Sequence, residues 1–289
     1  TAGCVRFAQE NGLLFNQLQR FWYSGAMFRY ERPQKGRYRQ FEQIGVECFG
    51  MQGPDIDVEL VLLCSRLWRE LGVEDQVNLE LNSLGDLEAR QQYQRKLVEY
   101  LEQYRSELDE DSQRRLTSNP LRILDTKVGH TREILRGAPI IKDFLDQDSR
   151  NHFDSLCSLL EQCGVSYIVN PNIVRGLDYY NRTVFEWVTD NLGAQGTVCG
   201  GGRYDGLVEQ LGGRSTPAVG FAIGIDRLVL MLAEKEKLLE DVDIYIVSQV
   251  GAARENAICL AENIRDRLRN KSVQLHCGSA KFKSQMKKA

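Results

Sequence analysis

Residues 20–51, RFWYSGAMFRYERPQKGRYRQFEQIGVECFGM, carry the clearest structural signal in the chain. Two stretches within them, 20–31 and 37–51, are rich in aromatic and β-prone residues, a composition typical of strands. Pro33 and Gly36 lie between the two stretches, and such residues mark a turn. We therefore predict two antiparallel strands joined by a basic, exposed loop, which is either a plain solvated turn or a nucleic-acid contact.

Four further segments show the periodicity of helices or strands. Apolar residues recur at helical spacing in 60–71 and 153–160, and Asp55 is the predicted N-cap of the first of these helices. Apolar patterning predicts strands over 77–81 and 165–169. Helices and strands thus mix along the chain.

Changes in composition divide the chain into four segments. Residues 1–85 and 166–238 contain the predicted strands and glycine-rich turns. Residues 86–165 are rich in Glu, Gln, Arg, Lys and Leu, which predicts a helical insertion domain. Residues 241–289 show a strand, a helix and a second strand, the opening of an α/β domain. The predicted fold class is α+β: an antiparallel-sheet domain with a helical insertion, followed by the start of an α/β domain.

Composition excludes several classes of protein. The chain has 289 residues, with 37 Lys+Arg against 40 Asp+Glu, which excludes a uniformly basic nucleic-acid coat but not a local basic site. No run approaches the roughly 18–20 apolar residues that span a bilayer. The eight cysteines include no CxxC pair. We expect reduced, mostly buried thiols in a cytoplasmic protein, and we predict no metal site made of protein side chains.

Histidine is scarce. The three histidines, His130, His152 and His276, lie outside the glycine- and arginine-rich segments. A Ser-His-Asp or Cys-His mechanism and a His-ligated zinc therefore have little support. We predict that each is an ordinary surface or core histidine.

Arginines stand out because they lie in predicted strands and tight turns among aromatic residues and glycines. They are Arg29, Arg37, Arg39, Arg175, Arg203 and Arg227. A guanidinium in a half-buried strand costs desolvation unless it meets an anion, and its planar fork fits phosphate bidentately. The set indicates either a polyphosphate site for phosphoryl or nucleotidyl transfer, or separate pairs with nearby acids. Those acids are Glu31, Asp178, Asp205 and Asp226.

The glycines at 200–202 and 212–213 allow a backbone to approach a ligand or another strand closely. The chain contains no GxxxxGK[ST] motif, which excludes a P-loop. The stretch QGTVCGGGRYDG is also not a strand–GxGxxG–helix dinucleotide site.

Four blocks of the sequence resemble the histidyl-tRNA synthetase family, which belongs to the class II aminoacyl-tRNA synthetases, in its bacterial, proteobacterial type. MFRYERPQKGRYRQFEQIGVE (27–47) is similar to class II motif 2, and AVGFAIGIDRLVL (218–230) to motif 3. VRGLDYYNRTVFE (174–186) and GTVCGGGRYDGL (196–207) resemble the two blocks peculiar to the histidine enzyme. The resemblance implies a class II catalytic domain with a helical insertion, followed by the start of an anticodon-binding domain.

The resemblance also implies roles for individual residues. The implied ATP-binding residues are Arg29, Glu31, Arg37, Phe41 and Arg227. Arg29 would grip the α-phosphate and Arg175 would face it from the other side as a fixed cation, which makes these two the implied catalytic residues. Glu31 would bond the adenine amino group, and Phe41 would stack on adenine. The implied histidine-binding residues are Thr1, Gln43, Glu47, Arg175, Tyr179, Tyr180 and Tyr204; the implied contacts to the tRNA acceptor end are Arg32 and Gln34.

The activity implied is ATP-dependent ligation of L-histidine to tRNA(His) through histidyl-adenylate, with Mg²⁺ accompanying ATP, by a cytoplasmic homodimer without a membrane segment. The alternatives are a non-catalytic regulatory subunit of histidine biosynthesis on the same fold, and a generic RNA-binding module that uses the basic hairpin. Motif 1, the family's dimer interface, would precede Thr1, and the segment 241–289 covers only the opening of the anticodon-binding domain. We therefore expect a chain truncated at both ends.

Overall fold

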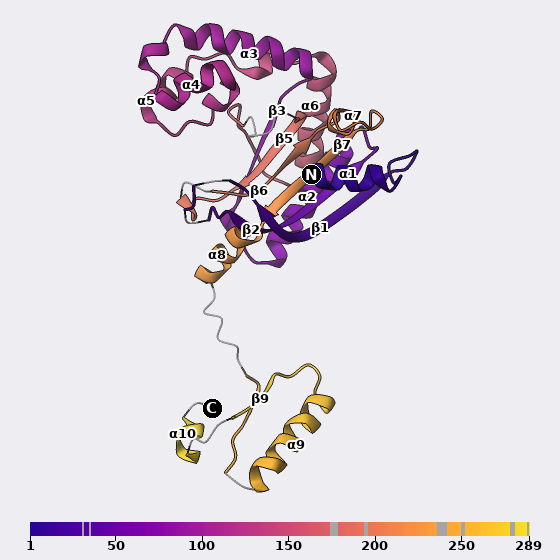
Figure 1. The fold of residues 1–289 in the computed structure, drawn as a ribbon, viewed down its shortest axis with the longest axis vertical. Helices are drawn as coiled ribbons and strands as arrows, with labels where there is room; N and C mark the ends of the chain where they lie inside the picture. The colour runs from indigo at the N-terminus through magenta and orange to yellow at the C-terminus, as the bar shows by residue number, and fades with distance from the viewer. Residues whose placement is uncertain are drawn as a thin grey trace. The chain divides into compact units, whose positions relative to one another are not determined.

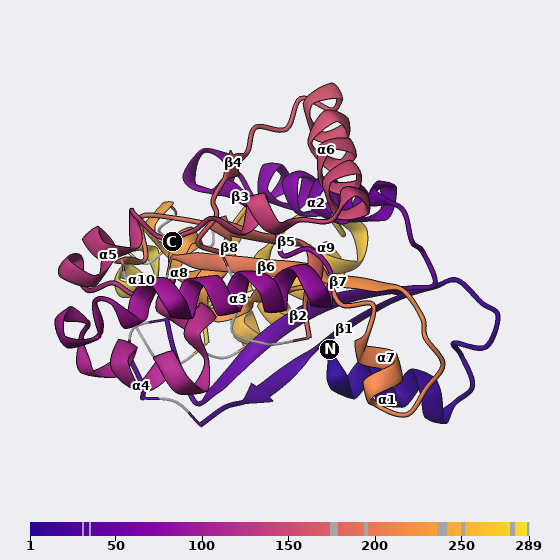
Figure 2. The ribbon, with the colours of Figure 1, turned by 90° about the horizontal axis from the view of Figure 1, so that it is seen from above.

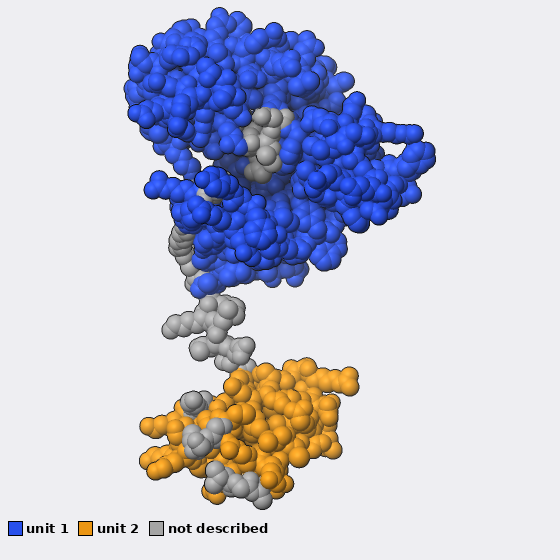
Figure 3. Space-filling view, in the orientation of Figure 1, with its two compact units in different colours: residues 1–234 blue, residues 235–289 orange. Residues whose placement is uncertain are grey.

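A computed structural model describes residues 1–30, 32–34, 36–173, 179–193, 196–235, 242–249, 252–277, 281–287 and 289. The chain forms two compact units, residues 1–234 and residues 235–289, coloured separately in Figure 3. None of the helices in the described ranges is long and apolar enough to cross a membrane.

A seven-stranded sheet forms the centre of the first unit (Figure 1). Its strands are β1 (Gln19–Phe28), β2 (Gln40–Phe49), β3 (Asn78–Ser83), β4 (Ile168–Val169), β5 (Asn181–Val188), β6 (Thr197–Arg203) and β7 (Ala218–Gly224). The order across the sheet is β1-β2-β7-β6-β5-β3-β4, and every neighbouring pair is antiparallel except β3 and β4. This mixed architecture with a mostly antiparallel sheet confirms the predicted α+β class.

The predicted hairpin is confirmed as β1 and β2, which pair along their whole length from Gln19↔Phe49 to Phe28↔Gln40. The backbone amides of Gln34 and Arg37 each donate to the other's carbonyl, which closes the turn between the strands. The predicted strand over 165–169 is shorter than expected, because only β4 pairs with β3.

Helices cover both faces of the sheet (Figure 2). In the first unit they are α1 (Ala2–Glu10), α2 (Pro54–Glu70), α3 (Leu87–Glu102), α4 (Glu110–Ser118), α5 (Gly129–Leu135), α6 (Gln147–Gln162), α7 (Leu207–Gln210) and α8 (Ile225–Lys235). Short 3-10 turns are η1 (Glu74–Gln76), η2 (Arg105–Glu107), η3 (Pro120–Ile123) and η4 (Ile141–Phe144). The predicted N-cap of α2 is wrong: Gly53 holds that position and Pro54 starts the helix, because the fixed φ of proline suits the first helical turn.

Two apolar clusters hold these layers together. Side chains of α2 and α6, including Trp68 and Leu156, pack against Phe185 and Phe221 on one face of the sheet. On the other face, apolar residues of the segment between β3 and β4 share a second cluster with the sheet residues Phe49 and Val184. That segment is therefore anchored on the sheet and not held by a flexible linker alone.

The second unit contains β8 (Ile244–Ile246), α9 (Ala252–Arg267), β9 (Val273–Leu275) and α10 (Phe282–Met286). The strands β8 and β9 pair in parallel, which confirms the predicted strand–helix–strand pattern. The assignment of residues 241–289 to an anticodon-binding domain stays a prediction, as do the other domain boundaries.

All eight cysteines are free thiols. Cys48, Cys64 and Cys199 are buried, but three others are exposed, so the expectation of mostly buried thiols is wrong. The exposed ones lie at the ends or outer faces of helices and strands, where the sequence pattern alone does not distinguish them.

Candidate active site

In the middle of the sheet, one face is formed mostly by glycine and alanine residues. In β7 the residues Val219, Phe221 and Ile223 pack into the apolar core, so their neighbours Ala218, Gly220, Ala222 and Gly224 face the other way. These small residues lie beside other glycines, because Gly220 pairs with Gly202, and Ala222 pairs with Gly45 and Gly200. The result is a floor of small residues across β2, β7 and β6.

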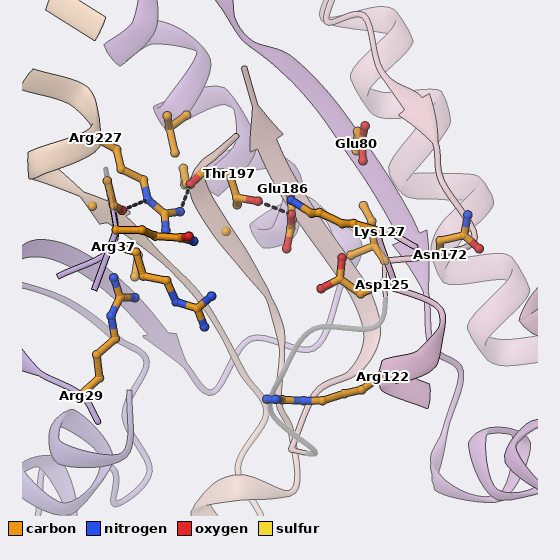
Figure 4. Close-up of a pocket in the computed structure, with 18 of the residues that line it drawn as sticks. Arg29, Arg37, Glu80, Arg122, Asp125, Lys127, Asn172, Glu186, Thr197 and Arg227 are labelled. Atoms are coloured by element: carbon orange, nitrogen blue, oxygen red, sulfur yellow. Dashed lines mark hydrogen bonds between the residues drawn. The ribbon is translucent and has the colours of Figure 1, made fainter. Parts of the chain in front are cut away.

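A cavity of about 860 Å³ lies over this floor (Figure 4). Its lining includes Gly200, Ala222 and Gly224 from the floor. It also includes several residues predicted to bind ATP or histidine: Arg29, Arg37, Phe41, Gln43 and Arg227. The structure thus brings together three of the predicted arginines in a single cavity of the size typical of ligand sites.

Backbone carbonyls orient two of these arginines. At the start of α8, Arg227 donates from Nε to the carbonyl of Gly36 at 2.8 Å and from Nη1 to the carbonyl of Thr197. Arg29 donates from Nε to the carbonyl of Tyr38 at 2.9 Å. These bonds hold the two guanidinium groups in place at the cavity. The lining therefore combines positioned cations with several acidic side chains.

Arg203 behaves differently, although it too follows a run of glycines. Its side chain is fully buried and donates to Asp57 Oδ1 at 2.6 Å and to Asp205 Oδ1 at 3.1 Å. Asp57 also contacts His152 Nε2 at 2.7 Å. For Arg203, therefore, the second interpretation is confirmed: this arginine pairs with nearby acids. Arg203 does not line the cavity.

The three histidines also lie outside that lining. His130 is exposed, whereas His152 and His276 are buried and bonded to Asp57 and Tyr245. These positions match the prediction of surface and core histidines.

A buried carboxylate lies next to the cavity. Glu47 is only 1% exposed. Tyr23 donates from its hydroxyl to Glu47 Oε1 at 3.1 Å, and Tyr204 donates to Oε2. Burial and the negative charge of Glu47 raise the pKa of Tyr23 and of Tyr204, so both phenols remain protonated donors at neutral pH. Gln43 connects this pocket to the cavity, because it lines the cavity and its Nε2 lies 3.5 Å from the Tyr23 hydroxyl.

Two glycines make room for this pocket. A Cβ atom at Gly220 would lie 2.0 Å from Glu47 Oε2 and 2.4 Å from the carbonyl of Val46. A Cβ atom at Gly45 would lie 2.2 Å from the ring of Tyr23. Any larger residue at either position would displace the carboxylate or the phenol, so the small side chains of the floor determine the shape of the pocket.

The other residues predicted to bind histidine gather around Glu47. The ring centroids of Tyr179 and Tyr180 lie 5.7 and 6.3 Å from that of Tyr204. The backbone nitrogen of Thr1 lies 3.3 Å from Glu47 Oε1 and 3.1 Å from the Tyr23 hydroxyl. The pocket therefore combines an anion with several hydroxyl groups.

Some predicted residues are placed elsewhere or not described. Glu31 and Arg175 lie outside the described residues. Gln34 lines the cavity, whereas Arg32 is exposed and absent from its lining. The predicted roles of these residues stay predictions.

The second wall of the cavity was not predicted from the sequence. It consists of residues 109–128 of the helical segment, among them Arg122, Asp125 and Lys127. Desolvation by the surrounding chain and the nearby charge of Glu186 raise the pKa of Asp125, although its side chain stays exposed at the cavity. Figure 4 shows Lys127 pointing toward Glu186, which itself accepts a hydrogen bond from Thr197 at 2.8 Å. No local motif identifies these residues, because they reach the site only through the packing of the helical segment on the sheet.

We compared the chain with known protein families and with solved structures. The sequence profile described as "Histidyl-tRNA synthetase" matches residues 1–228. The apo S. aureus histidyl-tRNA synthetase is 36% identical with a TM-score of 0.74, over 100% of this chain and 70% of that one. The chain belongs to the histidyl-tRNA synthetase family.

Two more distant structures share the fold of this histidyl-tRNA synthetase family member. An ATP phosphoribosyltransferase regulatory subunit/histidyl-tRNA synthetase from Bacillus halodurans is 21% identical with a TM-score of 0.66, over 100% of this chain and 76% of that one. A histidyl-tRNA synthetase from Nostoc sp. PCC 7120 is 18% identical with the same TM-score, over 100% of this chain and 71% of that one. At these identities the likeness concerns the fold alone.

Proposed function

We propose that the chain is a histidine–tRNA ligase, which joins L-histidine to tRNA(His) at the expense of ATP. The observation that carries this proposal is the shared cavity of Arg29, Arg37 and Arg227, joined through Gln43 to the buried Glu47 pocket. Three converging guanidinium groups suit a triphosphate, and the adjacent pocket suits a polar amino acid.

The chemistry needs no nucleophile from the protein. In the first step the carboxylate of histidine attacks the α-phosphorus of ATP, which forms histidyl-adenylate and releases pyrophosphate. Negative charge gathers on the α-phosphate oxygens, where Arg29 and Arg175 are the proposed stabilising cations. Arg37 and Arg227 are proposed to hold the outer phosphates. In the second step a terminal hydroxyl of tRNA attacks the carbonyl carbon of the adenylate and releases AMP.

Selection of histidine is attributed to the Glu47 pocket. Neutral imidazole has one nitrogen that donates and one that accepts, so it needs both kinds of partner. The Glu47 carboxylate and the hydroxyls of Tyr179, Tyr180 and Tyr204 supply these partners in our proposal. An analogue without the ring nitrogens would leave buried polar groups unpaired, which is costly.

The resemblance supplies the remaining parts of the proposal: the proteobacterial type, a cytoplasmic homodimer, and Mg²⁺ bound with ATP. Mg²⁺ usually keeps several waters and needs only one or two carboxylates beside the substrate phosphates. Glu186 and Asp125 line the cavity and fit this requirement. Bound Mg²⁺ would neutralise charge on the outer phosphates.

The deciding experiment is histidine-dependent ATP–pyrophosphate exchange by the full-length protein. Exchange that requires histidine supports the proposal, and its absence contradicts it. The non-catalytic regulatory subunit is the alternative, because one structure with this fold carries that description. Activity in the exchange assay excludes this alternative and also the generic RNA-binding module. We further expect Arg175→Ala to nearly abolish adenylate formation while histidine still binds.

A further inference from the structure

The cavity has a second wall that lies in the helical segment and not in the seven-stranded sheet, and this wall carries both basic and acidic side chains. Arg122 belongs to η3, and it lines the same cavity as Arg29 and Arg37. Figure 4 shows its side chain extending from the helical segment toward the side of the cavity where Arg29 and Arg37 lie.

The backbone that carries Arg122 is held firmly. Its neighbours Leu121 and Ile123 are buried, at 5% and 0% exposure, whereas Arg122 itself is exposed. Arg115 donates from Nη1 to the carbonyl of Arg122 at 3.2 Å. Arg115 is in turn paired with Asp111 at 2.6 Å. These contacts fix the backbone position from which the side chain of Arg122 extends.

Some charged groups of this wall are directed toward other residues. Lys127 points toward Glu186, and Asp111 is paired with Arg115. Asp109 caps α4 by accepting from the amide of Ser112 at 3.0 Å. Figure 4 shows the side chain of Arg122 directed toward the arginines of the sheet. Arg122 also lies near Asp125 of the same wall, because its positive charge acts against the raised pKa of that carboxyl.

We propose that Arg122 binds the outer phosphates of ATP and the pyrophosphate that leaves, with Arg115 as its positioning residue. The inference rests on the proposed ATP-dependent function. A tRNA contact is the competing explanation for a basic residue here, but the shared cavity with Phe41 and Arg29 favours the nucleotide. The helical segment then takes part in adenylate formation, before any tRNA is bound.

The test compares Arg122→Ala with Arg122→Lys, Arg115→Ala and a control, Arg114→Ala. Arg114 lies one residue before Arg115 on α4, is 77% exposed, and does not line the cavity. Without tRNA, we expect Arg122→Ala to raise the KM for ATP and for pyrophosphate about tenfold, the usual effect of losing a charge-assisted hydrogen bond. The KM for histidine should change less than twofold. Arg122→Lys should retain part of the affinity, Arg115→Ala should show a smaller effect, and Arg114→Ala none.

Unchanged exchange kinetics in Arg122→Ala would overturn the inference, and a defect confined to tRNA charging would assign Arg122 to tRNA. If the unsubstituted protein shows no exchange, the proposed ligase function is contradicted. The role of Arg122 can then still be tested by titrating the protein and its variants directly with Mg–ATP. Weaker ATP binding by Arg122→Ala than by Arg114→Ala supports it, whereas equal or absent binding overturns it. Equal thermal unfolding midpoints of the variants exclude a folding defect.

Discussion

The guanidinium group of Arg29 lies over the ring of Phe41, with Cζ 4.2 Å from the ring centroid. The family resemblance assigns Phe41 to adenine and Arg29 to the α-phosphate. A ring face covered by a guanidinium cannot stack on adenine at the same time. An exposed cation–π contact is worth only about 0.5–1 kcal/mol, so binding of a triphosphate can draw Arg29 away from the ring.

Arg29→Ala should lower the rate of adenylate formation about 10²–10³-fold, because one charge-assisted contact to the transition state is lost. The measurement is histidine-dependent ATP–pyrophosphate exchange. Arg39→Ala is the matched control, since Arg39 lies over Tyr30 at 5.9 Å and does not line the cavity. Equal losses in the two variants would contradict a specific role for Arg29.

Glu47→Gln should raise the KM for histidine about 10- to 100-fold with a smaller effect on the KM for ATP. Glu47 accepts hydrogen bonds from Tyr23 and Tyr204, and an amide in its place turns one acceptor into a donor. Glu42→Gln is the control, because Glu42 is exposed on the same strand. A rise in the KM for ATP alone would count against a histidine site at Glu47.

Gly220→Ala should both destabilise the protein and weaken histidine binding. The added methyl group would lie 2.0 Å from Glu47 Oε2, and overpacking of this kind costs roughly 1–3 kcal/mol. Gly129→Ala should be close to neutral, because nothing lies within 4 Å of its Cβ position. Urea unfolding and the KM for histidine are the two measurements, and an unchanged KM would show that the pocket tolerates the shift.

Asp57→Asn should destabilise the first unit by about 3–5 kcal/mol, because it removes the buried one of the two carboxylates that pair with the buried Arg203. Glu59→Gln on the same helix should cost less than about 1 kcal/mol, since Glu59 and its partner Arg20 are exposed. Chemical unfolding monitored by tryptophan fluorescence measures both. A loss from Asp57→Asn no larger than that from Glu59→Gln would contradict the prediction.

The same carboxylate predicts how stability depends on pH. Burial acts to raise the pKa of Asp57, but hydrogen bonds and charge from His152 and Arg203 outweigh it and leave the pKa lowered. Because the pKa of Asp57 is lower in the folded chain, its charged form stabilises the fold. This stabilisation is fully present when the pH is above the pKa of Asp57 in the unfolded chain, about 4, and it is lost as the pH falls through the pKa of Asp57 in the folded chain. The stability gap between the unsubstituted protein and Asp57→Asn should therefore narrow below about pH 4. A gap that is constant down to pH 2 would contradict this assignment.

Local patterns were sufficient for the hairpin and for the α+β class. The small-residue face of β7 was not predicted, although the alternation in AVGFAIG separates the core residues Val219, Phe221 and Ile223 from the small residues between them. The N-cap of α2 was missed because Asp55 and Pro54 are both favourable at a helix start, and only the backbone distinguishes their positions.

The sequence by itself determined which residues could carry the chemistry: a set of arginines among glycines and aromatics, and the blocks that resemble one enzyme family. Only the tertiary structure separated Arg227, which lines the cavity, from Arg203, which is bound to Asp57. Asp57 and Arg203 are 146 positions apart, and the helical wall that carries Arg122 reaches the cavity only across the folded sheet. The physical reason is that sequence periodicity depends on near neighbours, whereas the partner of a charged group is decided by distance in the folded chain.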